Sequence, residues 1–436
     1  MSRRIHAPIV LPCGDPFTVL RDATVDVDAT GTITYCGPRA GAPERRDAVV
    51  SELTGILLPG LINAHAHSPM TLLRGMGGDL PLMRWLHEVV FPAEAALTPD
   101  DVHAGMLLGS VEMLRHGVTT STEMYYQGEK VADAVLRTGG RLVLTGPVID
   151  LPGLSWRTAV KHIDDWIDTD GRIFGPGQRI ELGYGPHSAY MLPAEALEVI
   201  AESARAREAL VHIHAAETAG EDTELRERYG SVPRLLEEVG VLSGRALLAH
   251  AVHVDASDIA LLARSGASVA HCPGSNAKLA SGIAPLNELL AAGVPVGLGT
   301  DGPASNDDLD LLHEVQLTAM LARLSTGDST AVSAEQALLL ATRDGAAALG
   351  RADIGTLEPG RWGDLVHIDL DDPAFVAGAD APDEQLVANL VWGAGSRRVT
   401  DVWVAGEHVV TEGESTRVDR GQAQADVRAT AGRLRG

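Results

Sequence analysis

The sequence predicts an α/β protein built on a (β/α)8 barrel, with a smaller β-rich unit formed by the two ends of the chain. Three observations support this prediction. Eight apolar, strand-like runs alternate with helical stretches over residues 58–355, short strand-like runs occupy residues 1–57, and such runs return over 356–436. A chain of 436 residues is long for one compact unit, so one large and one smaller domain are expected.

The N-terminal segment contains short β-rich runs, such as 23–27 and 33–36, which Gly, Pro and Asp interrupt. Similar runs at 364–370 and 397–410 follow the central region. The last residues are polar and rich in Arg and Ala, which fits either a helix or a frayed end.

The central region predicts the barrel itself. Its strand-like runs are 57–67, 117–124, 141–150, 180–188, 209–217, 245–254, 268–276 and 295–303. They lack polar alternation, as parallel strands that are buried on both faces do. Stretches with helical spacing, such as 194–206 and 307–324, lie between them. A doubly wound sheet is the alternative, but no GxGxxG or GxxxxGK[ST] turn follows any of these strands.

Composition excludes several classes of protein. The chain has 35 basic and 59 acidic residues, a net charge of -24, so its surface repels nucleic-acid phosphates and anionic membranes but not a small nucleoside. Three cysteines without CxxC spacing fit neither a disulfide framework nor a cysteine zinc site. The sequence has no membrane-length apolar run and no secretory signal pattern, so we expect a cytoplasmic protein.

Four metal-ligand residues are predicted at the carboxyl ends of the barrel strands, which converge on one mouth. His65 and His67 end the first strand and face the same side, because residues i and i+2 of a strand do so. His214 ends the fifth strand and Asp301 follows the eighth. Three imidazoles and a carboxylate suit zinc, with iron(II) and manganese(II) as alternatives.

Further polar residues follow the same strand ends. Glu217 lies three residues after His214, where a carboxylate that is not a ligand can shuttle protons. His250 and His271 end strands six and seven and are candidates to stabilise developing charge, while His253 and His271 equally fit structural hydrogen bonding. The runs 87–91 and 313–317 begin like HExxH but lack its second histidine, which predicts ordinary helix faces.

The motifs LLPGLINAHAH, GPHS, HAAE, AHAVH, HCPGSN and LGTDGPASN, in this order, resemble the amidohydrolase superfamily. They are most similar to the branch that contains 5′-methylthioadenosine/S-adenosylhomocysteine deaminases, guanine deaminase and triazine hydrolases. The resemblance covers almost the whole chain. It implies that segments 1–57 and 356–436 form a small β-sandwich beside a TIM-type barrel over 58–355.

The resemblance also assigns roles. It implies metal ligation by His65, His67, His214 and Asp301. It implies proton transfer by Glu217, with help from His250, and by Asp301, which takes a proton from the attacking water. The implied reaction replaces the amino group of an electron-poor ring carbon by oxygen and releases ammonia. Binuclear barrels of this kind use a lysine on strand four, and none of Lys130, Lys161 and Lys278 lies there, so one metal is expected.

Substrate residues follow from the segment after strand one. Trp85 resembles a wall of a purine pocket, Glu94 a carboxylate that accepts hydrogen bonds from ribose hydroxyls, and His187 a histidine that contacts the purine. Gly146-Pro147 stands where some members carry an arginine for an acidic 5′ substituent, which leaves Arg157 as the nearest candidate cation.

The predicted function is therefore deamination of a 6-aminopurine nucleoside that is modified at the 5′ position. Candidate substrates are methylthioadenosine, 5′-deoxyadenosine, adenosine and aminodeoxyfutalosine, while the missing arginine disfavours S-adenosylhomocysteine. One alternative is hydrolysis of another amino- or chloro-substituted heterocycle, such as guanine or a triazine. A second alternative is a non-catalytic metal-binding scaffold. The resemblance is also compatible with a homo-oligomer.

Overall fold

The computed structural model describes residues 1–150 and 153–435. One of its two sheets contains eight parallel strands that hydrogen-bond in chain order. They are β6 (Leu61–Ala66), β7 (Val118–Glu123), β8 (Arg141–Val148), β10 (Ile180–Pro186), β11 (Leu210–Ala215), β12 (Arg245–His250), β13 (Ser268–His271) and β14 (Val296–Leu298), with the short β9 (Ile173–Phe174) antiparallel to β10. Each of the eight lies within one of the predicted runs, which confirms the barrel.

The ring of strands closes beside two of the predicted metal ligands. Ala66, at the end of β6, forms a parallel bridge with Asp301, which follows β14, and the Asp301 N–H donates to the His65 carbonyl at 3.0 Å. All residues of β6, β7, β11, β13 and β14 are buried, because side chains fill the ring on the inside and helices cover it outside.

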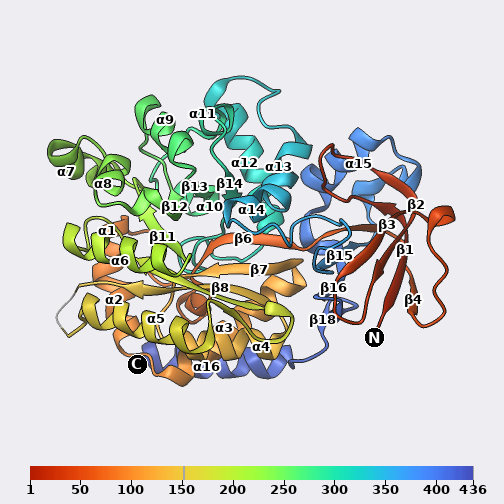
Figure 1. Cartoon of the computed structure of the whole chain (residues 1–436), viewed down its shortest axis with the longest axis horizontal. Helices are drawn as coiled ribbons and strands as arrows, with labels where there is room; N and C mark the ends of the chain where they lie inside the picture. The colour runs from red at the N-terminus through yellow and green to blue at the C-terminus, as the bar shows by residue number, and fades with distance from the viewer. Residues whose placement is uncertain (151–152, 436) are drawn as a thin grey trace.

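Helices connect successive strands on the outside of the barrel (Figure 1). They are α3 (Pro99–Arg115), α4 (Gly128–Thr138), α5 (Trp156–Asp170), α6 (Ala194–Ala206), α7 (Ala219–Tyr229), α8 (Val232–Glu238), α9 (Ala256–Ser265), α10 (Pro273–Lys278), α11 (Leu286–Ala291), α12 (Leu311–Thr326), α13 (Ala334–Leu340) and α14 (Arg343–Ala348). The predicted helix 194–206 is α6. The helix predicted over 307–324 begins only at residue 311, because the Asp310 side chain caps it by accepting the N–H groups of Leu312 and His313.

The segment after β6 returns to the barrel mouth as a run of short helical turns. It contains α1 (Leu82–Trp85), a π-helical turn (Leu86–Val90) and α2 (Phe91–Ala95). This run contains Trp85 and Glu94. The segment that covers the barrel mouth therefore also supplies two of the predicted substrate residues.

The two ends of the chain share a second, mixed sheet of nine strands. It contains β1 (Arg3–Val10), β2 (Leu20–Val27), β3 (Ile33–Pro38), β4 (Val49–Glu52), β5 (Ile56–Pro59), β15 (Leu365–Ile368), β16 (Val399–Val404), β17 (Glu407–Thr411) and β18 (Glu414–Ser415). N-terminal β5 pairs with C-terminal β15, so red and blue strands lie side by side in Figure 1. Because β5 extends to Pro59, the chain passes from this sheet into the barrel at Gly60.

The Arg/Ala-rich tail is a helix, α16 (Arg420–Arg435), and it packs on the barrel (Figure 1). The Thr430 hydroxyl donates to the Asp101 carboxylate of α3 at 2.8 Å, and Arg433 also donates to Asp101 at 2.5 Å. A further helix, α15 (Asp383–Asn389), lies between β15 and β16 in the chain and contacts α13. Among the described helices, none has the length and apolar character that a membrane crossing requires.

Candidate metal centre and active site

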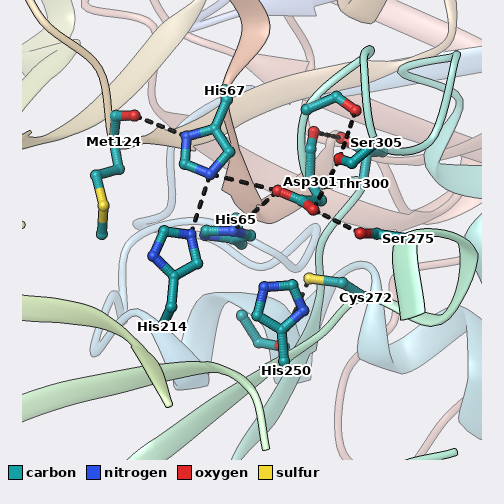
Figure 2. A network of polar contacts seen from close by, with 12 residues as sticks. His65, His67, Met124, His214, His250, Cys272, Ser275, Thr300, Asp301 and Ser305 are labelled. Atoms are coloured by element: carbon teal, nitrogen blue, oxygen red, sulfur yellow. Dashed lines mark hydrogen bonds and ion pairs between the residues drawn. The ribbon is translucent and has the colours of Figure 1, made fainter. Parts of the chain in front are cut away.

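The four predicted metal ligands converge at the mouth of the barrel (Figure 2). His65 and His67 come from the end of β6, His214 from β11 and Asp301 from the residues after β14. One ligand atom from each residue lies within 4.8 Å of the other three. Residues far apart in the chain therefore supply one compact set of three nitrogens and one oxygen, which suits tetrahedral zinc.

The ring nitrogens of this set face one another and the carboxylate. The Oδ1 atom of Asp301 lies 3.2 Å from Nε2 of His65 and 3.3 Å from Nε2 of His67. The Nε2 atoms of His67 and His214 are only 3.1 Å apart. Whether these nitrogens can bind a cation depends on which ring nitrogen of each histidine carries the hydrogen.

Backbone carbonyls set the ring hydrogens of two of these histidines. His67 Nδ1 lies 2.7 Å from the Met124 carbonyl, and His214 Nδ1 lies 2.7 Å from the His187 carbonyl. A carbonyl only accepts, so each Nδ1 carries the hydrogen. Burial lowers the pKa of His214 well below its usual value, so this ring is neutral and its Nε2 presents a lone pair.

A chain of three side chains sets the hydrogen of His65. The Thr145 hydroxyl donates to the Glu123 carbonyl, so Thr145 Oγ1 accepts from Nδ1 of His212, 3.0 Å away. Nε2 of His212 then accepts the Nδ1 hydrogen of His65 at 2.7 Å. Burial lowers the pKa of His65 to about 3, so the ring is neutral and its Nε2, which has no hydrogen-bond partner, presents a lone pair.

These assignments test whether the residues fit a metal ion. In the neutral form, the three Nε2 atoms present lone pairs toward a carboxylate, an arrangement that repels itself unless a cation lies between them. The donor set therefore fits a divalent metal. No lysine lies on the barrel strands, since Lys130, Lys161 and Lys278 belong to α4, α5 and α10, which agrees with a single ion.

Two hydroxyl groups orient the carboxylate of Asp301. Ser275 and Ser305 both donate to its Oδ2, at 2.6 and 2.8 Å, which leaves Oδ1 toward the histidines. Burial alone would raise the pKa of Asp301, but its interactions with the adjacent histidines, with His65 first and then His67 and His250, hold it well below the usual range. Asp301 also has a left-handed backbone, with φ of 58°, which is uncommon for this residue type and typical of functional sites.

Glu217 and His250 form a second group beside the ligands. Glu217 Oε2 lies 3.9 Å from His250 Nε2, and the His250 ring is held by Asn276 at 2.9 Å. Burial raises the pKa of Glu217, which favours the protonated carboxyl that a general acid needs. Burial opposes charge on His250, but the carboxylates of Glu217 and Asp301 outweigh it and raise its pKa.

A pocket of about 700 Å³, including its open mouth, lies over these groups. It is lined by His67, His187, His214, Glu217, His250 and Asp301 on its inner side, and by Trp85, Glu94, Tyr125, Tyr126, Pro147, Tyr190 and several aliphatic residues elsewhere. The predicted substrate residues Trp85, Glu94 and His187 thus share one pocket with the predicted metal ligands. An aromatic, largely apolar pocket with a few convergent polar groups suits a planar heterocycle.

Glu94 is half-buried and lines this pocket. Burial raises the pKa of its carboxyl group, although the nearby Tyr125 hydroxyl acts in the opposite direction. The Trp85 ring is fixed, because its Nε1 donates to the Met76 carbonyl at 3.0 Å. One segment therefore brings a fixed aromatic ring and a half-buried carboxylate to the same pocket.

Three other predicted residues lie outside this pocket. Arg157, expected as the nearest cation, points to the surface in α5, where it pairs with Glu195 at 2.7 Å and stacks on Trp156. His253 binds the Ser281 carbonyl, which fits structural hydrogen bonding, whereas His271 is buried and its Nδ1 has no hydrogen-bond partner.

Sequence reasoning missed several residues of the site. His212 repeats the i, i+2 spacing of His65 and His67, since it precedes His214 by two positions, and that signal was available. Ser275 and Asn276 lie in HCPGSN, directly after the seventh strand. Tyr125, Tyr126 and Tyr190 follow strands two and four, but no spacing rule distinguishes them from ordinary loop tyrosines.

Comparison with known proteins agrees with this geometry. The amidohydrolase family matches residues 56–409. The chain is 39% identical over 434 residues, 99% of its own length and 98% of the relative's, to a 5-methylthioadenosine/S-adenosylhomocysteine deaminase from Pelotomaculum thermopropionicum.

Two solved structures resemble the whole chain. An adenosine deaminase from Xanthomonas campestris with bound zinc is 34% identical, with a TM-score of 0.90 over 99% of this chain and 98% of that one. An atrazine chlorohydrolase from Arthrobacter aurescens complexed with zinc is 26% identical, also with a TM-score of 0.90, over 98% of this chain and 99% of that one.

Proposed function

Because the chain belongs to the amidohydrolase family, we propose that it is a zinc-dependent hydrolase that deaminates a 6-aminopurine nucleoside with an uncharged 5′ group to the inosine analogue and ammonia. One observation carries the proposal. The lone pairs of His65, His67 and His214 and the Asp301 carboxylate face one another in a pocket that also contains Glu217 and Glu94.

The chain's own residues supply the proton transfers of the reaction. A zinc ion held by His65, His67, His214 and Asp301 would supply Lewis acidity that makes water nucleophilic near neutral pH. Glu217, whose pKa burial raises, holds a proton that it donates to the purine ring nitrogen beside the attacked carbon.

The leaving group and the developing charge involve two more residues. Asp301 takes a proton from the attacking water, and this proton then passes to the departing amine. The proton of the added hydroxyl group returns to Glu217 as the ring carbonyl forms. His250, whose pKa the carboxylates of Glu217 and Asp301 raise, stabilises negative charge as it develops on the attacked centre.

Pocket composition supports the choice of substrate. Trp85 and His187 offer surfaces for the purine, and Glu94 offers two acceptor oxygens to neighbouring ribose hydroxyls. Among the described residues that line the pocket there is no lysine or arginine, so a carboxylate on the substrate finds no counter-charge. Methylthioadenosine, 5′-deoxyadenosine and adenosine are therefore favoured over S-adenosylhomocysteine.

The proposal also covers the class of substrate, the location in the cell and the oligomeric state. The substrate is a small molecule rather than a nucleic acid, in keeping with the net charge of -24. We also propose a cytoplasmic location, and a homo-oligomer stays compatible with the family.

A nucleoside panel tests the function. The zinc-loaded protein should convert at least one 6-aminopurine nucleoside, seen as loss of adenine absorbance with stoichiometric ammonia. Glu94→Ala should lower kcat/KM about 10- to 100-fold, because ribose hydroxyls lose a charged acceptor. If wild type converts no nucleoside, or if Glu94→Ala is as active as wild type and a triazine is hydrolysed instead, the nucleoside assignment is wrong.

A further inference from the structure

Glu314 is a buried carboxylate that no step of the proposed reaction uses. It lies in the first turn of α12, in the HE pair at 313–314 that the sequence suggested to be an ordinary helix face. That expectation is wrong for Glu314, which has no exposed surface. Burial raises the pKa of its carboxyl group to about 7, and no salt bridge to it occurs within the described residues.

The Glu314 carboxylate joins two connecting segments of the barrel mouth. We call them the 273–278 loop, which contains the short helix α10, and the 302–307 loop. Oε2 of Glu314 accepts the N–H of Gly274 at 2.8 Å, and its Oε1 accepts Nδ2 of Asn306 at 3.0 Å. Gly274 lies in α10, which follows β13, and Asn306 lies in the loop after Asp301. The two loops also contact each other directly, because Lys278 Nζ donates to the Ala304 carbonyl at 3.1 Å.

The same two loops orient the proposed proton-transfer groups. The 273–278 loop contributes Ser275, which donates to Asp301 at 2.6 Å, and Asn276, which holds His250 at 2.9 Å. The 302–307 loop contributes Ser305, which donates to the same oxygen of Asp301 at 2.8 Å. Glu314 touches none of these three residues, yet it binds the immediate chain neighbours of Ser275 and Ser305.

The close approach of Glu314 also explains the glycine at 274. A Cβ atom on Gly274 would lie 2.4 Å from Oδ1 of Asn306 and 2.5 Å from Oε1 of Glu314. Both distances are shorter than van der Waals contact, so a larger residue would force the loops apart. Glycine at position 274 therefore leaves the space that the buried Glu314 carboxylate occupies.

We propose that Glu314 is a positioning residue of the deaminase: it fixes loops 273–278 and 302–307 to each other and so holds Asp301 and His250 in their reactive orientations. This inference rests on the proposed function. Burying a carboxylate is costly unless its oxygens are hydrogen-bonded, and here both bonds go to the loops that carry Ser275, Asn276 and Ser305.

Three variants test the proposal on the best nucleoside substrate. Glu314→Ala should lower kcat about 10- to 100-fold, the range found when supporting groups behind a metal site are lost, while KM stays within about threefold and zinc content stays at one per chain. Glu314→Gln keeps a carbonyl acceptor for Gly274 and should stay within about threefold of wild type. His313→Ala, an exposed neighbour in the same turn, is the matched control and should match wild type.

A fourth variant reaches the same loops by a different route. Gly274→Ala leaves Glu314 in place but forces it away from the 273–278 loop, so it should lower kcat like Glu314→Ala with zinc retained. This variant keeps the proposal testable if Glu314→Ala does not fold. Three results would overturn the proposal. They are a wild-type kcat in Glu314→Ala or Gly274→Ala, a loss of kcat that follows loss of zinc, and equal losses of kcat in Glu314→Ala and Glu314→Gln.

Hydrogen exchange separates this inference from the proposed function. In Glu314→Ala, amides of residues 272–279 should exchange about five- to tenfold faster than in wild type, because one hydrogen bond of about 1 kcal/mol is lost. If wild type converts no nucleoside but this exchange is faster, the function has failed and the loop restraint stands. Unchanged exchange overturns the role of Glu314 whatever the substrate is.

Discussion

The two ends of the barrel bury charged and polar side chains in opposite ways. At the end where the strands begin, buried charges are matched within the protein: Arg141 pairs with Asp364 at 2.9 Å, and Glu181 binds Arg172, Arg245 and Arg351 at 2.6 to 3.1 Å. At the end where the strands finish, His65, His67 and His214 direct lone pairs at a shared point. A satisfied network stabilises a fold, whereas an unsatisfied one prepares a site for a ligand.

The largest effect is expected at the mouth, from Glu217→Gln. Glutamine keeps the shape but cannot donate the proton, so kcat should fall about 10²- to 10⁴-fold, equivalent to about 3–5.5 kcal/mol. Zinc content and the free energy of unfolding should change little, because Glu217 is not a ligand. Steady-state kinetics and metal analysis on the same sample measure both.

Glu221→Gln is the matched control for this prediction. Glu221 is also buried, four residues further on, where its Oε2 accepts the backbone N–H of Glu217 at 2.9 Å. A glutamine carbonyl can accept the same hydrogen, so the loss of kcat should be much smaller than for Glu217→Gln. Equal losses would show that the second variant disturbs the loop rather than the proton transfer.

The opposite result is expected at the other end, from Asp364→Asn. Arg141 and Asp364 are almost fully buried, with side-chain exposures of 0% and 2%, so the variant leaves a buried guanidinium without its counter-charge. The free energy of unfolding should fall by about 3–5 kcal/mol, measured by chemical denaturation, while kcat of the folded, zinc-loaded enzyme stays near wild type. A large loss of kcat with unchanged stability would contradict the contrast between the two ends.

A smaller effect is expected from His212, which belongs to the mouth but touches no substrate. His212→Ala removes the acceptor that fixes the His65 ring, so zinc affinity should weaken about 10- to 100-fold, measured by competition with a chelator. His253→Ala is the control, because His253 binds only the Ser281 carbonyl in the hydrogen bonds seen here and should leave zinc affinity unchanged. Equal affinities in both variants would mean that the ring of His65 needs no support.

The contrast between the ends also explains what the sequence could predict. Because the barrel strands are buried on both faces, their sequences are continuous apolar runs. A metal-ligating residue at the end of such a run therefore has a predictable place at the barrel mouth. His65, His67, His214 and Asp301 were therefore identifiable. His212 showed the i, i+2 spacing before His214, but its role could not be read from the sequence, because a histidine inside an apolar run also fits a core position and its contact is with Thr145 in β8.

Loops gave weaker predictions, because their paths in space do not follow from spacing. Glu314 is the second residue of an HE pair that lacks the second histidine of a known motif, and only its position in space, beside Gly274, reveals its contacts. Trp85, Glu94 and His187 reach the pocket as the resemblance implied, although they lie in or next to loops. For these three residues, the resemblance to a known family indicated a position in space that sequence spacing alone does not give.

The smallest effect is expected for Arg157, the predicted cation, which lies in α5 and does not line the pocket. Its side chain is 61% exposed and pairs with Glu195, itself 65% exposed, so Arg157→Ala should change the free energy of unfolding by less than about 1 kcal/mol. It should also leave kcat/KM within about twofold for methylthioadenosine and for S-adenosylhomocysteine alike, because no charge in the pocket is lost. A selective loss with S-adenosylhomocysteine would show that α5 moves toward the bound substrate. The uncharged character of the pocket, and with it the preference for a neutral 5′ group, would then be wrong.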